Sequence, residues 1–141
     1  MKHHTKTLGD LGVLKAKLDL FEKGYITCSP DTEHSPFDLV AVREEQCLRV
    51  QVKARNIDKV GTCTVHFRSS WADKNGTHMK RVDKSLIDLY CVYCVSTDKC
   101  YYFDPSKYKS SITLRMTEAK GTQKTNKNIN WHEDYLGIPK L

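Results

Sequence analysis

Residues 35–53 read SPFDLVAVREEQCLRVQVK. Two runs rich in Val and Leu flank the polar segment 43–46, and apolar and polar residues alternate along the second run, as they do on the two faces of a strand. We predict strands over residues 37–42 and 47–53 that pair through the short turn between them. This pairing decides which side chains meet across the two strands.

The predicted pairing brings three polar side chains together. Asp38 opens the first strand, while Gln51 and Lys53 share one face of the second because they are two positions apart. The carboxylate, the carboxamide and the backbone carbonyl of Val52 are oxygen ligands of the kind that Mg²⁺ prefers, and an ammonium group can position water or neutralise charge on a phosphate. The set suits metal-dependent phosphodiester hydrolysis. These residue types are also ordinary on strands, so spacing alone leaves both interpretations open.

Residues 7–24, upstream of this strand pair, have the pattern of an amphipathic helix. Large apolar side chains recur at steps of three and four, the spacing of one helical face: Leu11, Leu14, Leu18 and Phe21. We expect this face to be the buried one. Gly24 stands where a residue in the left-handed conformation commonly ends a helix.

The remaining segments predict mainly strands. They are residues 25–28, 60–67, 86–95, 99–103 and 111–116. Residues 68–81 are polar and contain Asn75-Gly76, a pair that favours a tight hairpin turn. One helix followed by many strands predicts an α+β fold with a mixed sheet, and 141 residues suit a single domain over 1–141.

Composition bounds the function. Lys and Arg total 23 against 17 Asp and Glu, for a net charge of +6. Such an excess favours polyanions such as nucleic acid, because binding releases condensed counterions, although a merely basic surface fits as well. No apolar run approaches the ~20 residues that cross a bilayer, and the N-terminus lacks the apolar stretch of a secretory signal. We therefore expect no membrane association and a cytoplasmic location, bacterial or organellar.

Six cysteines raise the question of a zinc site. Cys91 and Cys94 have the spacing of a metal-binding pair, but they fall in a predicted strand, where residues three apart point to opposite faces. No second pair completes a set of four ligands. We expect reduced, structural thiols rather than a zinc centre.

Several short motifs follow one another in a defined order. They are GDLG (9–12), GY (24–25), SPFDL (35–39), VQVK (50–53), IDLYC (87–91), YYF (101–103) and NW (130–131) with Tyr135. Their order and spacing resemble the PD-(D/E)XK nucleases, most closely the small endonucleases of this type encoded within group I introns. The resemblance implies a restriction-endonuclease-like core with an added β-hairpin. It also implies a Mg²⁺-dependent homing endonuclease that makes a double-strand break at a long DNA site.

The resemblance assigns roles to particular residues. Asp38 would be the metal-binding carboxylate and Lys53 the motif lysine. Gln51 occupies a position that is Glu or Asp in most of the superfamily, although Gln occurs there in the intron-encoded branch. Many members carry a Glu on the first helix where this chain has Val13. Asp10, three residues earlier, is a candidate substitute, or simply an acid favoured at a helix start by the macrodipole.

Residues 68–81 are the first candidate for DNA contact, because a two-stranded ribbon fits the major groove. The basic residues of this stretch are Arg68, Lys74, His78, Lys80 and Arg81. Further phosphate contacts are expected from Lys107, Lys109, Arg115, Lys120, Lys124 and Lys127. A solvated basic loop is the alternative interpretation.

Cutting both strands of a long site requires two active sites, so we expect a symmetric homodimer or homotetramer. The apolar tail of the chain either forms the interface or covers the core of its own monomer: Trp131, Tyr135, Leu136 and Ile138. Two other functions remain open. One is a Holliday-junction-type resolvase that prefers branched DNA. The other is a DNA-binding module with weakened catalysis, which Val13 and Gln51 favour.

Overall fold

A computed structural model describes residues 5–118 and 129–141. Its elements, in chain order, are α1 (Thr5–Glu22), β1 (Ile26–Cys28), β2 (Leu39–Arg43), β3 (Gln46–Arg55), β4 (Thr62–His66), β5 (Arg68–Asp73), β6 (Gly76–Arg81), the 3-10 helix η1 (Lys84–Leu86), β7 (Leu89–Cys94), β8 (Lys99–Phe103), η2 (Pro105–Lys107), β9 (Ser111–Arg115), β10 (Asn130–Trp131) and η3 (His132–Tyr135). They form the α+β fold that the sequence predicts.

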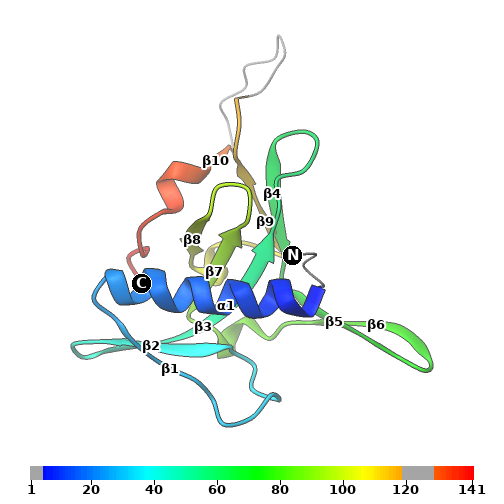
Figure 1. Ribbon diagram of the computed structural model, residues 1–141, viewed down its shortest axis with the longest axis horizontal. Helices are drawn as coiled ribbons and strands as arrows, with labels where there is room; N and C mark the ends of the chain where they lie inside the picture. The colour runs from blue at the N-terminus through cyan, green and yellow to red at the C-terminus, as the bar shows by residue number, and fades with distance from the viewer. Residues whose placement is uncertain (1–4, 119–128) are drawn as a thin grey trace.

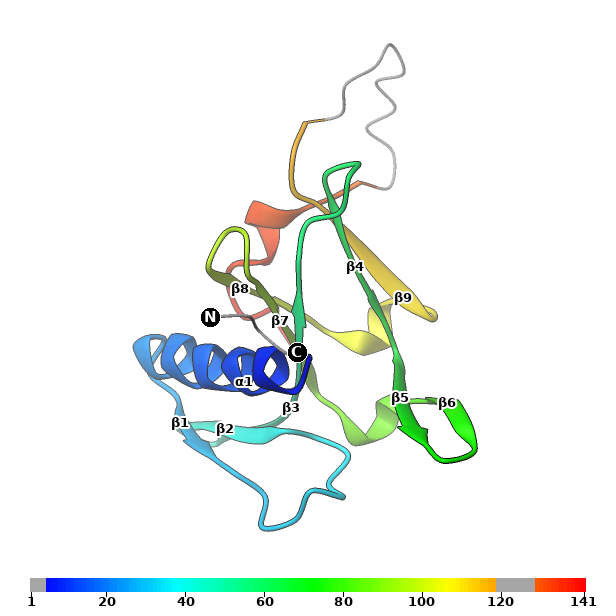
Figure 2. The same cartoon turned by 45° about the vertical axis from the view of Figure 1, so that its right-hand side comes forward.

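A five-stranded sheet in the order β1-β2-β3-β7-β8 is the centre of the molecule. Only β3 and β7 run parallel in it, so the sheet is mixed. The helix α1 packs on one face, and a smaller sheet of β10, β9 and β4 lies against the other (Figures 1 and 2). Each face has its own apolar core, and both cores are built from alternate residues of β7 and β8.

The predicted helix is confirmed, but the prediction of its buried face is wrong. The face of α1 against the sheet carries Gly12, Ala16 and Leu20. The large apolar residues point away from it, and three of them are exposed: Leu14 by 62%, Leu18 by 55% and Phe21 by 70%. A fourth, Leu11, is partly buried against the core.

Close approach of helix and sheet explains this choice. A Cβ atom added to Gly12 would lie 3.1 Å from the Cβ of Ala54 on β3, tighter than an ordinary contact, so glycine favours this close approach of the helix. The helix ends as predicted. Gly24 has φ of +89°, and the Tyr25 N–H donates to the Leu20 carbonyl oxygen at 2.9 Å, the bond expected of a Schellman cap.

Strand alternation places the cysteines as predicted. Cys91 belongs to the core beneath α1, and Cys94 belongs to the core on the opposite face of the sheet. The tail packs onto its own chain, because Tyr135 and Leu136 contact the second core and Ile138 contacts the first. This supports a covering role for these three residues. Within the described residues, no helix is long and apolar enough to span a membrane.

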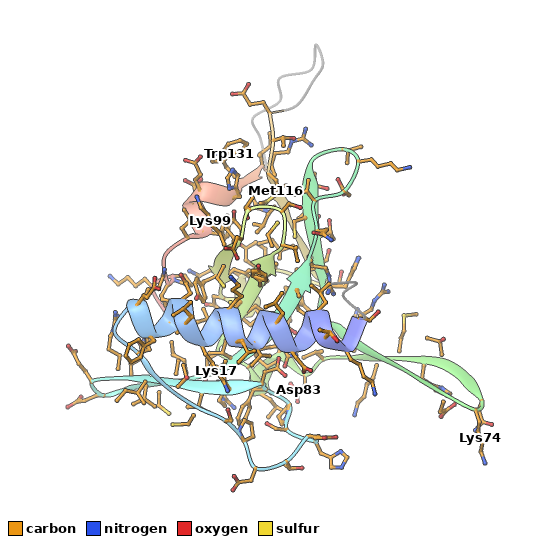
Figure 3. The ribbon with its side chains drawn as sticks, in the orientation of Figure 1. Lys17, Lys74, Asp83, Lys99, Met116 and Trp131 are labelled. Carbon is orange, nitrogen blue, oxygen red and sulfur yellow. The ribbon has the colours of Figure 1, made fainter. Side chains whose placement is uncertain are left out.

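The hairpin of β5 and β6 projects from the body of the molecule (Figure 1). Asp73 pairs with Gly76, so Lys74 and Asn75 form the two-residue loop, one position earlier than the sequence suggests. Gly76 follows the loop with φ of +115°. The predicted hairpin is therefore confirmed, with Lys74 at its tip (Figure 3).

Candidate active site

The strand registers bring the predicted polar residues into one row. Leu39 pairs with Val50 across β2 and β3, which sets Asp38, one residue before β2, opposite Gln51. Gln51 in turn pairs with Tyr90 on β7. Lys53 lies two positions further along β3, on the same face as Gln51. The row Asp38–Gln51–Tyr90 and the neighbouring Lys53 form the candidate site.

Backbone contacts hold the Asp38 carboxylate in place. Its Oδ2 accepts the Val52 N–H at 2.8 Å, and the Asp38 N–H donates to the Val50 carbonyl oxygen at 2.9 Å. Burial raises the pKa of Asp38, while the Val52 hydrogen bond and the positive charge of Lys53 lower it. Oδ1 accepts no hydrogen bond from the described residues, so one carboxylate oxygen is available to a ligand.

Lys53 is half-buried beside this carboxylate. Burial lowers the pKa of its ammonium group, the charge of Arg55 lowers it further, and the charge of Asp38 raises it. Its Nζ lies 3.5 Å from the carbonyl oxygen of Arg68, the first residue of β5. The lysine therefore lies where the projecting hairpin joins the central sheet.

An ion pair that the sequence analysis did not single out supports the site from the adjacent row. Arg49 Nε lies 2.9 Å from Asp88 Oδ2, and Arg49 Nη2 lies 3.0 Å from Asp88 Oδ1. The Arg49 N–H also donates to Oδ2 at 2.8 Å, and the Asp88 N–H donates to the Arg49 carbonyl oxygen at 2.9 Å. Arg49 lowers the pKa of Asp88. These bonds join β3 to the start of β7, where Gln51 and Tyr90 meet.

The structure does not bring Asp10 to this group. Asp10 is exposed on α1 and makes no hydrogen bond or ion pair with another described residue. Val13 is partly buried against the core beneath the helix. Among the described residues, no three His, Cys, Asp or Glu side chains lie close enough together to hold a metal ion. Any metal here would depend on Asp38 as its carboxylate, with neutral oxygens beside it.

A pocket of about 270 Å³ opens beside Asp38. The loop before β2 forms it, and acidic and hydroxyl side chains line much of it: Ser29, Asp31, Thr32, Glu33, Ser35 and Asp38. The donors near Asp38 are oxygens, and the Gln51 carboxamide has no hydrogen-bond partner among the described residues. This donor set fits a hard divalent cation that keeps several of its waters.

Comparison with known proteins identifies the family. A model of the PD-(D/E)XK endonuclease family matches residues 3–138. The chain belongs to this family. Its fold is similar to a solved bacterial homing endonuclease, I-Ssp6803I, with a TM-score of 0.72 and 21% identity over 94% of this chain and 88% of the other. No curated protein matches the sequence.

The family, the fold and the nuclease activity expected from the sequence are thereby confirmed. In this PD-(D/E)XK endonuclease, the residues predicted to form the motif lie just before one strand and within the strand that pairs with it. Pro36 and Asp38 precede β2, and Gln51 and Lys53 lie on β3. Because the match covers nearly the whole chain, it includes the projecting hairpin as well as the site.

Of the five basic hairpin residues predicted to contact DNA, all but His78 are exposed. Arg68 pairs with Arg81 at its base, so these two share one face, while His78 and Lys80 alternate onto the other. His78 Nε2 lies 3.0 Å from Asp73 Oδ1, whereas Lys74 and Lys80 extend into solvent. Three further predicted contacts, Lys120, Lys124 and Lys127, lie outside the described residues.

Proposed function

We propose that this endonuclease is a Mg²⁺-dependent enzyme that makes a double-strand break at a specific, long DNA site, as intron homing requires. The observation that carries the proposal is the meeting of Asp38, Gln51 and Lys53 on two paired strands. The name of I-Ssp6803I, a bacterial homing endonuclease, supports it.

Each residue of the site has a distinct task. Asp38 would hold Mg²⁺, and the Val52 N–H keeps that carboxylate oriented. Gln51 and the Val52 carbonyl add neutral oxygen ligands. When bound, the metal polarises the phosphate and lowers the pKa of water. Lys53 offers a hydrogen bond and positive charge to the phosphate as negative charge develops there. Asp10 would contribute only after α1 or a bound ligand brought it nearer.

The hairpin is the proposed DNA reader. A two-stranded ribbon fits the major groove, and this one begins at Arg68, whose carbonyl oxygen already meets Lys53. Arg68 and Arg81 at the base lie next to the site and would contact phosphates near the cut. Lys74, His78 and Lys80, with Lys120 and Lys124 elsewhere, would extend the contact along the DNA.

We also propose that the working enzyme is a homodimer or homotetramer, because one chain carries one site and two strands must be cut. Since Tyr135, Leu136 and Ile138 pack on their own core, the tail is not the surface we favour. The exposed residues Leu14, Leu18 and Phe21 form an apolar stripe on α1, which we call the α1 stripe. Exposed apolar surface of this kind is typical of an interaction site.

The decisive experiment is cleavage of a plasmid library of intron insertion sites, with Mg²⁺ or with EDTA, beside a branched junction. We expect a double-strand cut at one duplex site that EDTA abolishes. Asp38→Ala and Lys53→Ala should each reduce the rate about 100-fold or more and still bind DNA. Glu45→Ala and Lys59→Ala remove exposed charges outside the site and serve as matched controls.

Other outcomes would redirect the proposal. Cutting of the junction alone would indicate a resolvase. Tight DNA binding without cleavage of any substrate would indicate a binding module, in which the neutral Gln51 and the exposed Asp10 do not support catalysis.

A further inference from the structure

The Tyr90 hydroxyl is a buried polar group that lacks a hydrogen-bond partner among the described residues. Tyr90 is fully buried on β7, and its oxygen has no hydrogen-bond partner. No other buried side-chain nitrogen or oxygen in the described parts of the chain is left in this state. A buried polar group without a partner is costly, whereas phenylalanine would fill the same space at no such cost.

The packing of the ring prevents the hydroxyl from turning to another partner. Phe103 stacks on the ring of Tyr90, with centroids 5.4 Å apart and planes at 11°. Phe67 packs on it at 5.0 Å and 57°. The hydroxyl is thus held in one place by its neighbours, and that place is determined by the strand register.

The same register puts Tyr90 in the row of the candidate site. Tyr90 pairs directly with Gln51, and Asp38 lies on the far side of Gln51 in the same row. Asp38 is also near enough for its charge to act on the tyrosine: burial first, and then Asp38, raises the pKa of Tyr90 to about 12. The hydroxyl carries its proton at neutral pH, so it can donate a hydrogen bond to an incoming oxygen.

We propose that Tyr90 is a further catalytic residue of this site, whose hydroxyl donates its hydrogen bond to an oxygen that arrives with the ligand. The oxygen belongs either to the scissile phosphate or to a water held beside it. This inference rests on the proposed nuclease function. The hydroxyl is closed to solvent in the free chain, so the proposal requires neighbouring side chains to move when the ligand binds.

The test compares Tyr90→Phe with Tyr101→Phe. Tyr101 is equally buried and lies in the same core, but its hydroxyl is hydrogen-bonded, to Thr97 at 3.0 Å and to His132 at 3.3 Å. We expect Tyr90→Phe to unfold at the same urea concentration as the wild type or higher, and to cleave DNA about 10- to 100-fold more slowly. Tyr101→Phe should unfold at a lower urea concentration and cleave at the wild-type rate.

Binding measurements identify the oxygen. In Ca²⁺, weaker DNA binding by Tyr90→Phe would indicate the phosphate. An unchanged DNA affinity with a higher Mg²⁺ requirement for cleavage would indicate the water. The proposal is overturned if Tyr90→Phe cuts and binds as the wild type does, or if it loses as much stability as Tyr101→Phe. If wild-type protein cuts nothing, the proposed function itself fails, whereas a wild-type protein that cuts beside an unaffected Tyr90→Phe variant rejects the tyrosine alone.

Discussion

At the scale of single residues, Asp88 shows how the site is kept in place by a group that never touches DNA. Its carboxylate accepts hydrogen bonds from Nε and Nη2 of Arg49 and from the Arg49 backbone N–H. We expect Asp88→Asn to reduce the free energy of unfolding by about 1 kcal/mol at pH 7, a modest value because both side chains are about one-third exposed. Urea unfolding measures it, with Asp31→Asn as a control on an exposed loop.

The effect should depend on pH in a defined direction. Because the pKa of Asp88 is lowered in the folded chain, the unfolded chain binds more protons between that pKa and the ordinary aspartate pKa of 3.8. The stabilisation is therefore complete above about pH 4 and is lost as the pH falls through the folded pKa. Wild type and Asp88→Asn should converge in acid. Equal stability of the two at pH 7 would contradict the role assigned to this ion pair.

The same scale shows what a sequence reveals about a site. The strict two-residue period of a strand was enough to predict that Asp38 meets Gln51 and Lys53, because only one register joins the two strands. Tyr90 lay beyond that reasoning. Its significance comes from the lack of a hydrogen-bond partner, a property of the packed core that no spacing of residues along the chain expresses.

At the scale of elements, the hairpin of β5 and β6 should act on DNA through charge at its base. Arg81 lies opposite Arg68, beside Lys53, so we expect Arg81→Ala to lose a phosphate contact. DNA affinity should fall about tenfold, and the slope of log K against log salt should decrease by about 1. Fluorescence anisotropy over a salt series measures both quantities.

The matched control for this prediction is Lys99→Ala, which removes one exposed charge from β8, away from the hairpin (Figure 3). It should leave the affinity and the slope unchanged. Similar losses in the two variants would show that general charge, rather than the hairpin, attracts DNA.

Elements also show where sequence patterns fail. The strands and the hairpin follow from alternation and turn residues, but the buried face of α1 does not follow from hydrophobicity. Small side-chain size outweighed hydrophobicity, because Gly12 and Ala16 let the helix approach β3 closely. Leu14 and Phe21 remain exposed. Neither small residue stands out in a count of large apolar side chains. The distance between helix and sheet decides the face, and this distance is a tertiary quantity.

At the scale of the whole molecule, the exposed apolar face of α1 supports the assembly of two or more copies of the chain. The α1 stripe lies on the opposite side of the helix from its buried residues, and helical spacing places charges of both signs along each border of the stripe. One border carries Asp10 and Lys17, and the other carries Lys15 and Glu22. When two copies of α1 pack antiparallel about a two-fold axis, each border of the stripe faces the same border of the other copy. The two facing borders run in opposite directions. A second copy therefore brings opposite charges together beside matching apolar surfaces.

We therefore expect Leu18→Lys to disrupt this assembly. Sedimentation equilibrium should give the mass of two or four chains for the wild type and of one chain for the variant. Because a single chain carries one site, the variant should nick plasmid DNA instead of cutting both strands. Val60→Lys adds the same charge at a side chain that is 67% exposed, outside α1, and should leave both mass and cleavage unchanged. A wild type that sediments as one chain while cutting both strands would refute the interface.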